Sequence, residues 1–462
     1  MGFEPEEVVA ERPGSSVTHS EDQAMKRFIG LDVHKTVVEV CVIDEEGKRL
    51  FRRRIECTRG ALLRFAEELT KEDSIALEVT TNAWAVADLL QPFVELVVVS
   101  NPMKTKAIAE AKVKTDKVDA EVLAQLLRCD YLPSVWVPDQ QTRSLRQLTS
   151  RRERLVAERT RLKNRIQSVL ASRLVPVPVK TLFSQEGLKW LVGCELPADQ
   201  RALIDSDLRL MKGVDQEIAE LEVALRHQAW NQDRVRLLMT IPGVDYCVAL
   251  ALIAALGDLS RFADGDHAAS YLGLTPSIKQ SANTCHYGPI TKRGASNARW
   301  LLTQAAQNMG RQPGPLGVSF RRLAKRKCWN VAVCATARKL VGVAWLMLKN
   351  NEPYRYANPA TTQQKLSRLR VAVTGELRQP EHKGRRPGVK NGDHPPTRLT
   401  ASLDQVCRQE GLPPVHGFEE LPAGEQRVLL SLGVIDYVQR INQDQRVPRS
   451  VKPRKHEKRC KT

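Results

Sequence analysis

The chain has 462 residues, of which 42% are hydrophobic, and it carries 71 Lys and Arg against 53 Asp and Glu, a formal charge of +18. This length exceeds what one hydrophobic core comfortably supports, so we expect two or three folded units plus tails. The positive surplus favours a polyanionic partner, because each phosphate neutralised by Lys or Arg releases condensed counterions. Aromatic residues make up only 5%, which argues against a surface built to stack single-stranded bases. A merely soluble basic protein, or one with a basic tail, is the alternative that charge alone leaves open.

The cysteines and the apolar stretches indicate the cellular location of the protein. Ten cysteines are scattered without any Cys-x-x-Cys pair, which is typical of reduced thiols rather than a disulfide framework or a zinc site. The N-terminus lacks an apolar stretch of signal length, and we expect no segment to reach the roughly 18 apolar residues that span a bilayer. We therefore expect a cytoplasmic protein with no membrane partner.

The first folded unit is expected over residues 27–138, after a polar, disordered leader at 1–26. Three strands joined as a meander precede an alternation of helices and strands. The predicted strands are 28–33, 37–43, 50–56, 75–79 and 96–99, and the predicted helices are 60–69 and 83–90. This order predicts an α/β fold, a mixed sheet with helices on its faces.

Two long helices are predicted next, in a linker over residues 139–232. Apolar residues follow 3-4 spacing from Leu145 to Val169 and again from Met211 to Leu225, which indicates coiled-coil packing. Arg152 and Arg159 lie at the intervening seam positions. The pattern allows an antiparallel hairpin, an oligomer seam or an ordinary bundle.

A third, mainly α-helical unit is expected over residues 233–352. Residues 237–244, which contain Ile-Pro-Gly-Val, and the apolar run 248–256 predict a helix, a tight hairpin and a second helix. Such a helix-hairpin-helix element presents backbone N–H groups that bind phosphate. Residues 353–462 are expected to be a basic, largely disordered tail, because 361–462 hold 20 Lys and Arg against 11 Asp and Glu in aperiodic, proline-bearing sequence.

Four carboxylates suggest a catalytic centre. Asp32 and Glu78 lie at the ends of two predicted strands, which adjacent pairing would bring together. Asp116 and Asp119 share one face at the start of a predicted helix. Converging carboxylates repel one another unless a hard cation joins them, so we expect Mg²⁺ or Mn²⁺ bound by all four. Two such ions activate an attacking oxygen and stabilise a leaving oxygen in phosphodiester transfer.

Each acid also has an ordinary explanation as a surface or capping residue, and Asp116 suits the first turn of a helix. His34 and Lys35 follow Asp32 directly and are predicted to contact phosphate, although solvated side chains remain the alternative. The four acids taken together, on strands and a helix in this order, indicate metal-dependent chemistry.

The chain resembles the insertion sequence 110 transposases, a family that includes the Piv site-specific invertase. The resemblance runs in order through residues 27–350. Matching stretches are residues 29–35 (Ile-Gly-Leu-Asp-Val-His-Lys), 77–78, 115–120, 241–244, 271–276 and 288–294. It implies a RuvC-like (RNase H-type) domain with an Asp-Glu-Asp-Asp metal site, then a coiled-coil linker and a transposase domain.

The resemblance also implies a nucleophilic serine, which falls on Ser281. Family members have Ser-Ser-Gly there, whereas this chain has Gln280, Ser281 and Ala282, so the surrounding turn is altered. Lys292 and Arg293 are predicted to hold phosphate. The family further implies a non-coding guide (bridge) RNA, which pairs with donor and target DNA, and a homo-oligomer, either a dimer or a tetramer, in the bacterial or archaeal cytosol.

We therefore expect a transposase that cleaves and rejoins DNA strands with a metal site and Ser281. Two rival functions remain. One is a RuvC-like structure-specific nuclease that uses water and forms no protein–DNA bond. The other is an inactive, nucleic-acid-binding transposon remnant, which Gln280, Ala282 and the long tail favour and the intact set of acids opposes.

Overall fold

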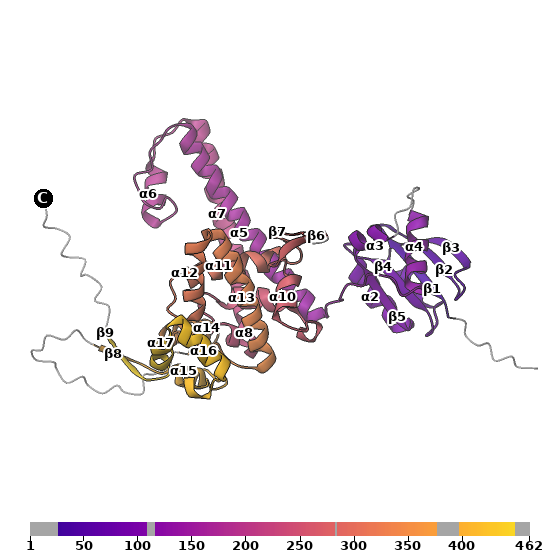
Figure 1. Ribbon diagram of the computed structural model, residues 1–462. Coiled ribbons are helices and arrows are strands. Elements are labelled where there is room, and N and C mark those ends of the chain that lie inside the picture. Colours follow the sequence, from indigo (N-terminus) through magenta and orange to yellow (C-terminus); the bar gives the residue numbers. More distant parts are fainter. Residues whose placement is uncertain (1–25, 109–115, 282–283, 377–396, 449–462) are drawn as a thin grey trace, which may run out of the picture. The chain divides into compact units, whose positions relative to one another are not determined.

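The computed structural model describes residues 26–108, 116–281, 284–376 and 397–448 (Figure 1). The chain divides into two compact units, Met1–Pro138 and Asp139–Thr462. The expected leader lies almost wholly outside the described residues. Residues 139–462 form one unit, whereas we expected a linker, a transposase domain and a tail as separate parts. The reason is a continuous hydrophobic core that extends from Leu145 to Ile441.

The first unit contains a five-stranded mixed sheet, as the sequence predicted. Its strand order is β3-β2-β1-β4-β5, in which β1, β2 and β3 are antiparallel while β4 and β5 run parallel to β1. This arrangement is consistent with an RNase H-like sheet. The elements are β1 (Phe28–Val33), β2 (Val37–Ile43), β3 (Arg49–Glu56), α1 (Arg59–Ala66), β4 (Ser74–Glu78), α2 (Ala83–Leu90), β5 (Leu96–Ser100), α3 (Pro102–Ile108) and α4 (Asp116–Arg128).

Helices cover both faces of this sheet. On one face, α1 and α2 bury apolar side chains against alternate strand residues such as Leu31 and Leu77. On the other face, Ala120, Leu123 and Ala124 of α4 pack on the residues that point the opposite way. Strand side chains alternate between faces, so residues two apart along a strand share the same helix partner.

The second unit begins with two long helices, α5 (Gln140–Ser172) and α7 (Ala198–Trp230), with α6 (Gln185–Gly193) between them (Figure 1). They pack along their length as an antiparallel hairpin within one chain, which decides between the alternatives that the sequence left open. Buried Leu155, Leu162 and Ile166 face buried residues of α7. The seam arginines pair across this contact, Arg152 with Glu222 at 2.7 Å and Arg159 with Asp215 at 3.1 Å.

The remainder of this unit is mainly helical, with two small two-stranded sheets, β6–β7 and β8–β9. Its elements are α8 (Asp233–Leu238), α9 (Tyr246–Leu256), α10 (Gly265–Tyr271), β6 (Pro276–Ser281), β7 (Thr284–Ile290), α11 (Ser296–Met309), α12 (Pro315–Arg326), α13 (Trp329–Asn350), α14 (Pro359–Thr374), β8 (Thr397–Thr400), α15 (Leu403–Gln409), α16 (Ala423–Leu432), α17 (Ile435–Ile441) and β9 (Gln445–Pro448). Short 3₁₀ turns are Leu259–Arg261 and Phe418–Glu420 in this unit and Gln91–Phe93 in the first.

The expectation of a largely disordered tail is wrong for the described part of 353–462. Helices α14 to α17 pack on the second unit, and Leu366, Leu403 and Ile441 are almost completely buried in its core. Composition misled the prediction because short helices with few apolar residues each gain their stability from packing rather than from their own periodicity.

The helix α13 also differs from expectation, because its length and hydropathy suit a membrane span. More than half of that apolar stretch is buried inside the unit, and Ala337, Leu340 and Val341 belong to its core. It is therefore packed as the core helix of a globular unit.

The predicted helix, turn and helix are present as α8 and α9. The Asp245 carboxylate accepts a hydrogen bond from the Val248 N–H at the start of α9. From α14, the buried Lys365 ammonium donates to the carbonyl oxygens of Ile241 and Val244 at 2.7 and 3.0 Å. The Asp245 carboxylate therefore lies at the helix start where phosphate would bind, and phosphate binding by this hairpin stays a prediction.

Candidate active site

The position of α4 brings acids from distant parts of the chain together. Gly30 lies on β1 directly beneath α4, and a Cβ there would meet the Ala120 carbonyl oxygen at 1.8 Å. Glycine therefore permits a backbone approach that any side chain would prevent. Asp116 is one helical turn before Ala120, and Asp32 is two residues after Gly30 on the same strand face. The first turn of α4 is thus held over the end of β1.

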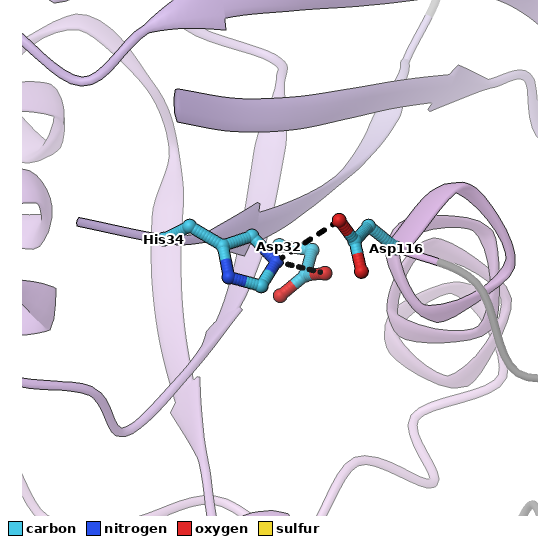
Figure 2. Close-up of side chains that lie close together, drawn as sticks. All are labelled: Asp32, His34 and Asp116. Atoms are coloured by element: carbon cyan, nitrogen blue, oxygen red, sulfur yellow. Dashed lines mark hydrogen bonds and ion pairs between the residues drawn. The ribbon is translucent and has the colours of Figure 1, made fainter. Parts of the chain in front are cut away.

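Asp32, His34 and Asp116 form a compact cluster (Figure 2). The His34 Nε2 atom lies 3.1 Å from Asp32 Oδ2 and 3.4 Å from Asp116 Oδ2. The donor atoms of the three side chains all lie within 4.8 Å of one another, which suits a bound metal ion. The Asp32 side chain is 16% exposed, whereas those of His34 and Asp116 are nearly half exposed. The cluster is therefore closed on the β1 side and open on the other.

The electrostatics of Asp32 also fit a cation. Burial raises the pKa of the Asp32 carboxyl group, and the nearby Asp116 and Asp119 carboxylates raise this pKa further, while His34 lowers it. A raised carboxyl pKa means that the negative charge is costly here without a compensating cation. The residues of the cluster therefore fit a divalent metal ion.

Asp119 and Glu78 lie outside the tight cluster. Asp119 shares the first turn of α4 and is close enough to Asp32 to affect its pKa. In the parallel pair β1–β4, Leu31 lies opposite Leu77, so Asp32 and Glu78 both follow that pair and belong to the face covered by α4. The sequence predicted this convergence for all four acids, and their role as metal ligands stays a prediction.

Sequence analysis missed the position of His34 within the cluster and predicted only a phosphate contact for it. The available signal was the spacing Asp-x-His at the end of a strand, which places both side chains on one face. Lys35 is exposed beside it, and its predicted phosphate contact stays a prediction.

The close approach at Gly30 makes a sharp prediction. We expect Gly30→Ala to lower the free energy of unfolding by about 2 kcal/mol, because the new methyl group meets helix backbone rather than a flexible side chain. Metal affinity should fall with it, since α4 must move outward with Asp116. The control is Gly213→Ala on α7, where a Cβ meets nothing within 4 Å. Chemical unfolding measures both, and wild-type stability of Gly30→Ala would contradict the packing argument.

Ser281 lies in the second unit, at the end of the exposed two-stranded hairpin β6–β7. The register pairs Ser281 with Thr284 and Lys279 with His286, and all four side chains are exposed. Residues two apart on a strand and residues directly opposite share a face, so Ser281 has Lys279 and His286 on its own side. Ala282 lies outside the described residues.

The matching stretches 271–276 and 288–294 form the base of this hairpin. The Lys292 N–H donates to the Gly273 carbonyl, and a Cβ on Gly273 would meet the Arg293 backbone at 2.4 Å. Gly273 also has a φ of +69°, which favours glycine. Lys292 and Arg293 are exposed on this base, beside the strands that carry Ser281, and their phosphate contact stays a prediction.

A charge pattern that sequence analysis overlooked surrounds this hairpin. Residues 267–351 contain 13 Lys and Arg and no Asp or Glu. Several of these cations are exposed and have no ion-pair partner in the described part of the chain, namely Lys279, Lys292, Arg293, Arg311, Lys325, Arg326, Lys327 and Lys339. A segment of this length without acids gives the positive surplus a location outside the tail, and it suits a phosphate backbone.

A mixed sheet with helices on both faces and a carboxylate cluster at its edge is consistent with an RNase H-like enzyme domain that binds a divalent metal. Residues 29–174, which include the sheet of the first unit and helix α5, match a family model of DEDD transposases of the IS110 type, described as "Transposase". Residues 235–316 match the model "Transposase IS116/IS110/IS902 family".

Relatives with described roles agree with these matches. The chain is 25% identical to the transposase for insertion sequence element IS1111A of Coxiella burnetii, over 71% of this chain and 91% of that protein. It is 25% identical to the pilin gene-inverting protein of Moraxella bovis, over 71% and 98% respectively. It is 24% identical to a 43.6 kDa protein of insertion element IS110 of Streptomyces coelicolor, over 72% and 96%.

The chain belongs to the IS110/IS116/IS902 family of transposases. It is therefore an enzyme of DNA transposition with a catalytic DEDD domain, and DNA is its substrate.

Proposed function

We propose that this transposase cleaves and rejoins DNA strands at a divalent-metal site formed by Asp32, Glu78, Asp116 and Asp119. The observation that carries the proposal is the meeting of Asp32 from β1 with Asp116 from α4, since these residues are 84 positions apart in sequence. Bound Mg²⁺ or Mn²⁺ would supply Lewis acidity toward the scissile phosphate. The carboxylates hold the cation, and the open side of the cluster admits the DNA backbone.

Ser281 is the proposed nucleophile. Its Oγ forms a bond to phosphorus and loses a proton, while the bond to the leaving deoxyribose oxygen breaks and that oxygen gains a proton. The number of phosphoester bonds is unchanged, so rejoining needs no ATP. The exposure of Ser281 and the cations Lys279, Lys292 and Arg293 on the same hairpin and its base support this role. We propose that the chain acts as a dimer or tetramer, as the resemblance to the family implies.

Choice of DNA sequence is assigned to a guide RNA encoded by the same element, in the bacterial or archaeal cytosol. The support is the resemblance to the family, together with the basic segment 267–351, which contains no Asp or Glu. Such a surface suits recognition of backbone and helix shape, which leaves sequence reading to base pairing.

Removal of the metal tests the proposal. Purified protein with its element's RNA and a supercoiled donor plasmid should nick the plasmid in Mg²⁺ or Mn²⁺. Excess EDTA should abolish nicking, and added Mg²⁺ should restore it, because the acids act only through the cation. Filter binding of the same DNA in EDTA provides the control. Nicking at an unchanged rate in EDTA would contradict the metal site.

A further inference from the structure

We propose that His34 is a direct nitrogen ligand of the divalent cation, and that the site consequently binds Mn²⁺ more tightly than Mg²⁺. This inference rests on the proposed metal site and adds a donor that an Asp-Glu-Asp-Asp set does not contain. It also changes the ion that the protein selects.

The geometry supports ligation. Two ligand atoms at about 2.1 Å from one ion and at right angles to each other are about 3.0 Å apart. The His34 Nε2 atom lies 3.1 Å from Asp32 Oδ2 and 3.4 Å from Asp116 Oδ2, close to that separation on both sides. The same nitrogen therefore approaches both carboxylates, as Figure 2 shows.

The backbone around His34 is fixed before any ion arrives. Its N–H donates to the Val37 carbonyl at 2.9 Å, and its carbonyl accepts from the Asn82 Nδ2 atom at 3.2 Å. Asn82 Nδ2 also contacts Cys57 Sγ at 3.0 Å, and Thr80 donates to Asn82 Oδ1. Thr80 lies just beyond the strand that ends in Glu78. These contacts fix the backbone position from which the His34 imidazole extends toward the two carboxylates.

The chemistry of the three groups favours a cation between them when the Nε2 atom carries no hydrogen. Carboxylate oxygens and such an imidazole nitrogen are all lone-pair donors, so they repel one another at these distances, and a metal ion satisfies all three at once. The alternative is an Nε2 atom that carries a hydrogen and donates it to the Asp32 carboxylate, and the experiment separates the two.

Ion preference follows from the donor set. Mg²⁺ binds oxygen ligands almost exclusively and gives up water reluctantly, whereas transition-metal ions accept imidazole nitrogen readily. One nitrogen among carboxylates therefore favours Mn²⁺ over Mg²⁺, while the acids alone would accept either ion.

The test uses the full chain with one equivalent of Mn²⁺ and no nucleic acid. Pulsed electron paramagnetic resonance should show coupling of the bound Mn²⁺ to a nitrogen nucleus in the wild type and lose it in His34→Gln. Titration calorimetry should show that His34→Gln weakens Mn²⁺ binding about tenfold while it changes Mg²⁺ binding little. His34 is largely exposed, and thermal unfolding without metal should confirm that the variant folds.

Two further variants make the assignment specific. His267→Gln is the matched control, because His267 Nδ1 also lies beside an aspartate, 2.8 Å from Asp264, but without a second carboxylate in contact. It should keep the nitrogen coupling. Asp32→Asn should lose the bound Mn²⁺ and so identify the site.

Each outcome bears on one proposal or both. Mn²⁺ that binds in an Asp32-dependent way without nitrogen coupling would overturn the ligation by His34 and leave the metal-dependent function intact. Coupling that persists in His34→Gln would also overturn it. A wild-type protein that binds neither Mn²⁺ nor Mg²⁺ would refute this inference and the proposed metal site together.

Discussion

Strand cleavage should fall on the order of 10³-fold when Asp116 is replaced by Asn, while binding of DNA stays within a factor of about two. The amide keeps the size of the side chain but removes the negative charge that the cation needs. Asp116 is half exposed at the start of α4, so the fold should tolerate the change. The loss should appear as a lower rate of cleavage, measured with supercoiled DNA under saturating Mg²⁺.

The matched control is Asp130→Asn, which makes the same chemical change in the same unit. Asp130 is exposed, and its backbone φ of 49° is one that Asn also adopts. This variant should cleave like the wild type. Full cleavage by Asp116→Asn would refute the proposed metal site, whatever Asp130→Asn does.

Ser281→Ala should eliminate a covalent protein–DNA adduct and reduce strand exchange by about 10⁴-fold or more, since no other group replaces the nucleophile. Denaturing gels of protein mixed with labelled DNA would show the adduct as a shifted, protease-sensitive band. The hairpin should remain folded, because the Ser281 side chain is exposed and its loss removes no buried contact.

Ser296→Ala is the control, an exposed serine in the same unit at the start of α11. Its adduct should equal that of the wild type. If Ser281→Ala cleaves DNA normally and the wild type forms no adduct, the chain is instead a nuclease that uses water. If the wild type neither cleaves nor forms an adduct with its RNA and Mg²⁺ present, the chain is an inactive remnant.

The structure explains the two arginines in the coiled-coil seam between α5 and α7. Arg152 and Arg159 interrupt an apolar stripe, which indicated an imperfect zipper. In the structure, these two arginines form ion pairs with Glu222 and Asp215 on α7. The seam therefore alternates buried apolar residues with partly buried ion pairs. Such pairs specify register and direction more than they add stability. The partner acids are about 60 to 70 residues away, and no local pattern selects them.

Local sequence determined the strands and helices of the first unit and the presence of acids at their ends. Alternating apolar residues and turn residues act between near neighbours, so β1, β2 and β4 lie within a residue or two of the predicted positions. The acids could be located by the same reasoning, because strand ends and helix starts are local features.

Tertiary packing alone decided which of these groups meet. The crossing of α4 over Gly30 sets the distance between Asp116 and Asp32, and it depends on backbone contact between segments 90 residues apart. The inclusion of His34, the contacts of Lys365 with the turn before α9 and the folding of residues after 353 likewise depend on partners distant in sequence. Such contacts form only after the chain has closed long loops. The periodicity of apolar residues describes one helix or strand at a time, so it does not predict these contacts.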